Sequence, residues 1–400
     1  MGRVGFDVIV VGARCAGSPM AMLLARKGYR VLLLDRAEFP SDTLSTHLLH
    51  PPGVTALRRW GLLERVVASG CPPIHTYSYD FGTHIVSGAP GREAEPVAYA
   101  PRRHVLDHLL VEAAARAGAE VRTGFTVAAI LVDADGRVTG VRGRTRTGPE
   151  VTEHATVVVG ADGQRSTVAA AVSARRYNER PRAMCGYYRY YSGLEMDGVF
   201  EAYTRPWRGF AAAPTHDGLT MVVSGWPFAE MHARRADLEG NYLAGFEQAP
   251  HFAERLRAAR PETRLLGTSL PGFFRKPFGP GWALVGDAGY TRDFITAQGI
   301  SDAFATAQWC AEALDDTFTD RRPFDTAMAG YQVLRDRRAL RIYDFTADLA
   351  TLAPPEPDFL RLLDTVSGDP AAMRDFVQVN SGLLAADEFF LRYGSMAPAR

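Results

Sequence analysis

The residues with the most recognisable chemistry stand near the start of the chain. Residues 7–11 read as a buried strand, the turn 12–17 follows, and a helical run leads to a second strand that ends at Asp35. Gly12 permits a sharp turn, and Gly17 lets the helix pack closely on the strand. The helix N-terminus would direct free N–H groups at a pyrophosphate, and Asp35 has the spacing of a ribose-binding acid. The segment therefore predicts a site for an adenine dinucleotide.

One position departs from this turn pattern. The pattern Gly-x-Gly-x-x-Gly requires a second glycine so that the backbone can approach the pyrophosphate, and Arg14 stands there instead. Two interpretations remain open. The guanidinium could bind the phosphates, or it could point to solvent and leave the site damaged.

Two later stretches repeat the combination of a buried strand, glycine and aspartate. They are residues 157–163, Val-Val-Val-Gly-Ala-Asp-Gly, and residues 281–289, which contain Gly286 and Asp287. Strands rich in aromatic residues occupy positions 177–230 between them and predict a separate antiparallel sheet. Helical spacing of apolar residues predicts helices over 54–68, 103–117 and 299–314.

The predicted fold class is thus α/β. A Rossmann-type domain is interrupted by an antiparallel-sheet domain that would hold the substrate, and helices follow at the C-terminus. The expected boundaries are residues 1–75, 101–175 and 265–325 for the dinucleotide domain, 76–100 and 176–264 for the substrate domain, and 326–400 for the helical region.

Composition excludes several classes of protein. The 400 residues include 45 basic and 45 acidic side chains, so no nucleic-acid or membrane-surface partner is expected from charge. No apolar run is long enough to span a membrane, and no signal region opens the chain. The basic residues are arginines except for Lys27 and Lys276, which together with abundant alanine and glycine suggests a GC-rich bacterial genome.

The cysteines give no sign of a metal site or of disulfides. They are scattered and lack a Cys-x-x-Cys pair, which fits a reducing cytoplasm, so we expect a cytoplasmic protein without a metal. The four positions are Cys15, Cys71, Cys185 and Cys310.

Taken together, the three glycine–aspartate motifs resemble the group A flavoprotein monooxygenase superfamily. This superfamily includes para-hydroxybenzoate hydroxylase-like enzymes, geranylgeranyl reductase-like enzymes and flavin-dependent halogenases. The resemblance covers about residues 5–320 and implies FAD as the cofactor. Tyr290, Phe294 and Ala297 depart from residues common in the family, as does Arg14.

The resemblance also implies roles for individual residues. Asp287 would bind a ribityl hydroxyl, and Val127 would lie near the adenine. The turn 297–300, at the start of the helix predicted over 299–314, would face the flavin pyrimidine, where negative charge develops on reduction. Ser45 and Thr46 would lie beside the isoalloxazine ring. The implied cofactor-binding residues are Gly12, Ala13, Arg14, Ala16, Gly17, Asp35, Arg36, Ser45, Thr46, Arg103, Val127, Asp162, Gly286, Asp287, Gly299 and Ile300.

Two histidines in the polar loop 41–50 are candidates for catalysis. His47, or alternatively His50, could act as a base on a phenolic substrate, because histidine titrates in the useful range. A structural role for either histidine is the competing interpretation. The aromatic residues of 187–226 could line an apolar substrate cavity or simply form core.

Three reactions and one non-enzymatic role are compatible with these features. The favoured reaction is a monooxygenase that uses O2 and transiently bound NAD(P)H to hydroxylate a small aromatic or polyketide-type metabolite. A reductase or dehydrogenase of the geranylgeranyl reductase type is the alternative, although those reductases commonly carry a cysteine after the ribose acid and none stands between Cys15 and Cys71. A halogenase is less favoured because neither lysine is well placed and Trp-x-Trp-x-Ile-Pro is missing around Trp226. A flavin-binding protein without activity also remains. The oligomeric state is not readable.

Overall fold

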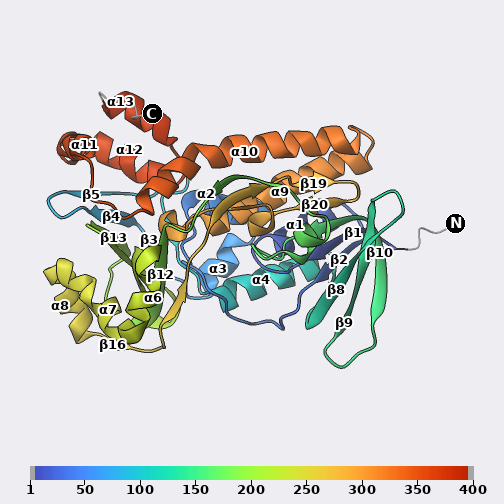
Figure 1. Cartoon of the computed structure of the whole chain (residues 1–400), viewed down its shortest axis with the longest axis horizontal. Coiled ribbons are helices and arrows are strands. Elements are labelled where there is room, and N and C mark those ends of the chain that lie inside the picture. The colour runs from blue at the N-terminus through green and yellow to red at the C-terminus, as the bar shows by residue number, and fades with distance from the viewer. Residues whose placement is uncertain (1–4, 395–400) are drawn as a thin grey trace.

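A parallel sheet forms the centre of the first domain in the computed structural model, which describes residues 5–394 (Figure 1). The sheet has the strand order β19-β20-β10-β1-β2-β7, and β1 pairs in parallel with both β10 and β2. Burial on both faces explains why residues 8–11 of β1, all of β2 and residues 157–159 of β10 are apolar without interruption. The bounds are β1 Phe6–Val11, β2 Val31–Leu34, β7 Glu120–Arg122, β10 Val151–Gly160, β19 Phe278–Gly279 and β20 Trp282–Leu284.

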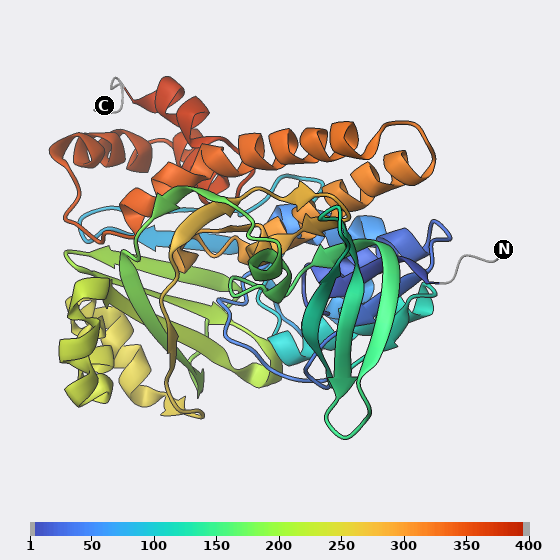
Figure 2. The same cartoon turned by 45° about the vertical axis from the view of Figure 1, so that its right-hand side comes forward.

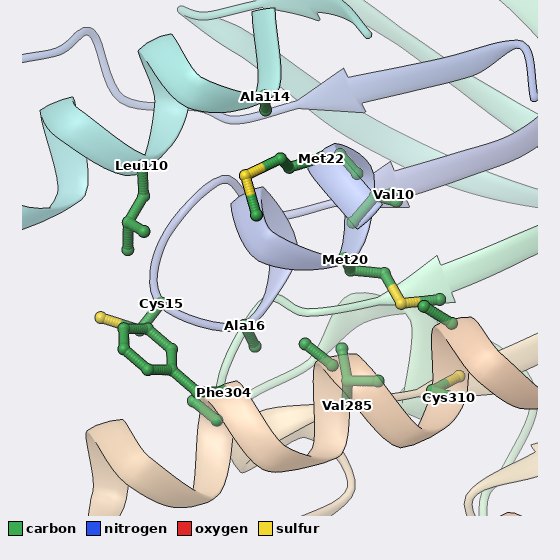
Figure 3. Packing of buried hydrophobic residues seen from close by; sticks show 14 of the residues in the cluster. Val10, Cys15, Ala16, Met20, Met22, Leu110, Ala114, Val285, Phe304 and Cys310 are labelled. Carbon is green, nitrogen blue, oxygen red and sulfur yellow. The ribbon is translucent and has the colours of Figure 1, made fainter. Parts of the chain in front are cut away.

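Helices cover one face of this sheet, and a β-hairpin with a short helix covers the other. Val8 and Val10 pack into the helical side with α1 (Gly17–Ala25), α4 (Arg103–Arg116) and α9 (Gly299–Phe318). Figure 3 shows side chains of α1, including Met20 and Met22, between those of α4 and α9. Ile9 and Val11 face the hairpin of β8 (Phe125–Val132) and β9 (Val138–Thr145) together with α5 (Thr167–Ala171).

A second, antiparallel sheet lies beside the first domain (Figure 2). Its order is β16-β12-β15-β14-β13-β4-β5, with one parallel pair between β13 and β4. One face packs on α7 (Leu238–Ala244) and α8 (Pro250–Ala258), with α6 (Met231–Arg234) beside them. The strands are β4 Thr76–Asp80, β5 Ile85–Gly88, β12 Met184–Ser192, β13 Val199–Arg205, β14 Arg208–Pro214, β15 Thr220–Pro227 and β16 Arg260–Pro261.

Four helices complete the part of the chain that the structure describes. The long helix α10 (Phe324–Leu349) packs on α9 and runs across the top of both domains in Figure 1. Helices α11 (Pro357–Ser367), α12 (Pro370–Asn380) and α13 (Ala386–Tyr393) follow, and α12 packs against β5 at the edge of the second sheet. The predicted α/β fold with an inserted antiparallel sheet and C-terminal helices is therefore confirmed.

The structure corrects three details of the sequence-based expectations. The helix expected over 54–68 is two helices, α2 (Pro51–Trp60) and α3 (Leu63–Ala68), because Gly61 adopts a left-handed φ of 74° between them. Strand β17 (Leu266–Thr268) still pairs with β12, so the second sheet continues past the expected boundary at 264.

The third correction concerns β11 (Arg176–Arg180). It joins a small sheet with β18 (Gly272–Arg275) and β21 (Tyr290–Thr291) rather than the large antiparallel one. Strands β3 (Pro73–Ile74) and β6 (Ala98–Tyr99) form a further short pair. Within residues 5–394, no helix is long and apolar enough to cross a membrane.

Candidate flavin site and substrate cavity

The turn between β1 and α1 approaches two other backbone segments closely. Gly12 has a φ of 102°, and a Cβ atom there would lie 2.4 Å from the carbonyl oxygen of Ala161. A Cβ atom on Gly17 would lie 1.7 Å from the carbonyl oxygen of Gly12. Both positions therefore exclude any side chain, and the N-terminus of α1 lies beside the loop that follows β10.

Asp35 is positioned by this turn. Its Oδ2 accepts a hydrogen bond from the backbone N–H of Ala13 at 2.7 Å, and its Oδ1 accepts one from Ala37 at 2.8 Å. Each carboxylate oxygen retains a second acceptor position that a ribose hydroxyl can use. Arg36 is exposed, and Val127 lies half-buried on β8, two residues beyond Phe125, whose N–H donates to the carbonyl of Asp35.

Arg14 adopts neither of the two arrangements expected from the sequence. Its guanidinium donates to Oδ2 of Asp107 at 2.5 Å and to the hydroxyl of Ser41 at 3.1 Å. Arg103 donates to both oxygens of the same carboxylate at 3.1 Å. Asp107 is fully buried and so binds two guanidinium groups, which fixes α4 and loop 41–50 against the turn.

Gly286 and Asp287 lie on the other side of the same turn, in the short 3₁₀ helix Gly286–Ala288. A Cβ atom on Gly286 would lie 2.8 Å from that of Ala16, which places the second glycine–aspartate motif against α1. Asp287 is in part exposed, yet the surrounding protein removes much of the water around its carboxyl. This desolvation, followed by the charge of Asp302, raises its pKa to about 6, although Arg103 opposes the shift.

The N-terminus of α9 is exposed close to Asp287. Gly299 is exposed, a Cβ atom there would have no neighbour within 4 Å, and Ile300 is buried beneath it. Gln298 holds the preceding turn: its Oε1 accepts from Arg292 at 2.7 Å, and its Nε2 donates to the carbonyl of Asn380 at 3.0 Å. A twenty-residue helix thus presents its positive end at an open surface.

Asp162 has a structural partner of its own. Its Oδ2 accepts from the backbone N–H of Thr167 at 2.6 Å at the start of α5, and its Oδ1 is buried without a partner. Burial raises the pKa of this carboxyl. Asp162 therefore shapes the loop after β10, where Ala161 contacts the first turn.

His47, in the loop 41–50, is fully buried. Its Nε2 lies 2.6 Å from the hydroxyl of Tyr190, and the hydroxyl of Ser45 accepts from its backbone N–H at 3.0 Å. Burial and the charges of Arg103 and Arg102 lower its pKa to about 3, so it is neutral near pH 7. His47 does not line the cavity described below.

His50, in contrast, lines that cavity and connects β4 to the turn before α9. Its Nε2 lies 3.0 Å from the carbonyl oxygen of Thr296, and its Nδ1 lies 2.9 Å from the hydroxyl of Tyr77. A carbonyl can only accept, so Nε2 carries the proton and the tyrosine donates to Nδ1. Burial lowers the pKa of His50 to about 4, so this neutral tautomer holds the turn before α9.

A cavity of about 1040 Å³, a volume that includes its opening to solvent, lies between the second sheet and the C-terminal helices. Its walls come from β4, β12–β15, α10, α11 and α12, and from two segments of the first domain, Thr46–His50 and Phe294–Ala297. The lining is mainly aromatic and aliphatic, and includes Tyr79, Phe81, Met184, Phe200, Tyr203, Phe210, Met221, Val223, Phe345, Phe359 and Phe376.

The sequence left open whether the aromatic residues of 187–226 line a cavity or form core, and the structure shows both arrangements. Phe200 lines the cavity, whereas Tyr187 and Trp226 stack on each other within the core that faces α7 and α8. Tyr203 and Phe210 border the cavity, but their rings pack on Phe252 of α8 in that same core. The two faces of one sheet therefore have different roles.

The residues present fit FAD. Gly12, Gly17 and Gly286 leave backbone surfaces that a side chain would fill, and the open N-terminus of α9 lies beside the motif cluster. FAD, when bound, supplies the redox chemistry, while the protein binds and orients it. Sequence reasoning missed Asp107 and Gln298, although the spacing of Arg103 and Asp107 by four residues in a helix is a recognisable signal for an ion pair.

A family model described as "FAD binding domain" matches residues 5–235. The chain belongs to this family. It is therefore a flavin-dependent oxidoreductase with FAD as its cofactor, and the resemblance to the group A flavoprotein monooxygenases is confirmed.

Relatives of this flavoprotein differ in their reactions. Digeranylgeranylglycerophospholipid reductase of Methanothrix thermoacetophila is 28% identical over 350 residues, 83% of this chain and 82% of that protein. The 6-methylpretetramide 4-monooxygenase of Streptomyces rimosus is 28% identical over 369 residues and 84% of each chain. The structure of the myxobacterial chondrochloren halogenase CndH superposes with a TM-score of 0.80 at 23% identity, covering 99% of this chain and 98% of that one. The last comparison shows the fold alone.

Proposed function

We propose that the protein is an FAD-dependent monooxygenase that uses NAD(P)H and O2 to hydroxylate a small aromatic or polyketide-type metabolite. The observation that carries this proposal is the apolar cavity, whose walls include both Thr46 and the turn Phe294–Ala297. The resemblance assigns Thr46 and the turn that begins at Ala297 to the flavin ring, so a molecule in the cavity would meet the ring at one end. An apolar enclosure also excludes water from the reacting atoms.

Neutral side chains at the flavin end of the cavity fix the backbone of the turn before α9. His50 fixes the carbonyl of Thr296 through its Nε2 proton, and the hydroxyl of Thr296 lies 3.2 Å from that of Thr346 on α10. Gln298 joins the same turn to α12 through Asn380. Three elements that wall the cavity thereby hold the start of α9, where N–H groups favour negative charge on the reduced cofactor.

His47 stays a prediction as the catalytic base. A histidine with a pKa near 3 is a weak base, and a proton could reach it only through the hydroxyl of Tyr190. The His47→Gln variant tests this role. A general base predicts that kcat falls at least tenfold with an altered pH profile, whereas a structural role predicts lower stability with an unchanged pH profile.

Two observations bear on the alternative reactions. The reductase relatives keep that reaction as the second candidate, but all four cysteines are buried, and none lines the cavity within the described chain. Against a halogenase, Lys27 pairs with Asp315 at the far end of α9, and Lys276 lies over Phe278. Neither lysine is among the residues that line the cavity.

Oxygen incorporation is the test of the proposed function. The flavin-loaded protein is reduced with NADPH or NADH, mixed with ¹⁸O2 and a panel of phenols, and the products are analysed by mass spectrometry. A product with one ¹⁸O atom per molecule supports the proposal. Reduction of an alkene without oxygen incorporation would instead establish the reductase, and consumption of NAD(P)H without any product would refute both.

A further inference from the structure

The cavity has a wall without charged side chains. Among the described residues that line it, there is no Asp, Glu, Lys or Arg. The only titratable side chains there are His50, Tyr79 and Tyr203, and burial lowers the pKa of the histidine and raises those of the tyrosines. All three are thus neutral near pH 7. An anionic ligand would lose its hydration here without gaining a counter-charge.

The cavity is also long. Thr46 and His50 mark its flavin end, and His50 is bonded to Tyr77, near the start of β4. Tyr79 and Phe81 follow at two-residue steps and both line the cavity. A strand rises about 3.3 Å per residue, so roughly 13 Å separates Phe81 from Tyr77, the partner of the lining residue His50. That length suits two or three fused rings rather than one.

One polar group on this wall has no partner within the protein. Tyr79 makes edge-to-face contacts with Tyr77, Phe200 and Phe376, and these contacts hold its ring in place. Tyr79 is half-buried, and its hydroxyl has no hydrogen bond to any described residue, although most buried tyrosine hydroxyls here have one. A phenol in this position is suited to donate to an oxygen of the ligand.

We propose that the cavity binds an uncharged, elongated aromatic molecule whose reacting end lies at the flavin turn and whose far oxygen accepts a hydrogen bond from Tyr79. This inference rests on the proposed function for the assignment of the reacting end. The claims on charge, aromatic class and Tyr79 concern binding alone and can be tested without turnover.

The binding test uses three naphthalenes that differ only at one end. 2,6-Dihydroxynaphthalene carries a far hydroxyl, 2-naphthol carries hydrogen, and 6-hydroxy-2-naphthoate carries a carboxylate. Each is titrated at pH 7 into the oxidised holoenzyme, and binding is followed by the change in flavin absorbance. We expect the diol to bind about five to ten times more tightly than 2-naphthol, and the carboxylate at least ten times more weakly than 2-naphthol.

Two variants assign these preferences to residues. Tyr79→Phe keeps the ring and should make the diol and 2-naphthol bind equally. Val223→Lys places a cation on the lining and should bring the binding of the carboxylate to that of 2-naphthol or tighter. Val333→Lys adds the same charge at an exposed site outside the cavity and should change nothing.

Each part of the inference can fail separately. Equal binding of carboxylate and 2-naphthol by the unmodified enzyme overturns the claim that the ligand is uncharged. A preference for the diol that survives in Tyr79→Phe overturns the role of Tyr79, and failure of all three probes to bind at millimolar concentration overturns the aromatic class. Tight, discriminating binding without ¹⁸O incorporation would keep the inference and refute the proposed monooxygenase.

Discussion

Replacing Gly17 by alanine tests whether the first turn has the close backbone contact on which flavin binding depends. The added Cβ atom would lie 1.7 Å from the carbonyl oxygen of Gly12, and real Cβ contacts essentially never fall below 3.0 Å. Because this neighbour is backbone and not a flexible side chain, the strand–helix turn itself must move by roughly 1.3 Å, and overpacking of this kind costs about 1–3 kcal/mol. We expect the free energy of unfolding to fall by that amount and FAD affinity to fall at least tenfold.

The chain offers a matched control in Gly330→Ala on α10. Nothing lies within 4 Å of a Cβ atom there, and alanine in a helix interior is favoured over glycine by about 0.5–1 kcal/mol. The same chemical change should therefore have opposite signs at the two positions. Urea denaturation of the apoprotein measures stability, and titration with FAD measures affinity. Wild-type stability and FAD affinity in Gly17→Ala would refute the reasoning.

The charges around the site lead to three more predictions. Asp107→Ala leaves the buried guanidinium of Arg103 and the half-buried one of Arg14 without their carboxylate and should lower the free energy of unfolding by about 3–5 kcal/mol in urea denaturation. Arg14→Ala leaves the Arg103 pair intact and should cost clearly less. The folded-state pKa of Asp287 is raised from 3.8 to about 6, so between these pH values the folded apoprotein binds more protons than the unfolded chain. Its free energy of unfolding should therefore fall as pH rises from 4 to 6. Asp287→Asn should remove this contribution to the pH dependence, and the same pH dependence of melting in both proteins would contradict the prediction. The pKa of His50 is lowered to about 4, so kcat/KM should show no ionisation of this residue between pH 6 and 8, and His50→Leu should lower stability without changing the shape of the pH profile there.

The local chemistry of the flavin site could be predicted from the sequence. Gly12 and Gly17 stand at positions where the backbone must turn or pack closely, and Asp35 ends a strand that is apolar throughout. Each of these features depends on residues within one strand–turn–helix unit, so spacing along the chain suffices to recognise it. The repeat of glycine and aspartate at Asp162 and Asp287 then indicated that the same sheet continues after the insertion.

The surroundings of those motifs depended on the fold. Arg14 could not be assigned to phosphate or solvent because its partner, Asp107, lies on α4, far away in sequence. Likewise His47 and His50 are near neighbours in one loop, yet one is buried against Tyr190 and the other lines the cavity. Sequence spacing carries no information about which element packs on which side of a loop.

The sequence by itself determined the cofactor class and the order of the domains, because short-range spacing encodes turns, helix starts and buried strands. Only the tertiary structure decided where a substrate can bind. The cavity joins strands β4 and β12–β15 to helices α10–α12 and to the turn before α9, segments that come together only when the second sheet packs beneath the C-terminal helices. Its neutral lining is a property of that packing, since charged residues such as Asp80 and Arg205 lie on the same strands, where they pair with each other and are not among the lining residues.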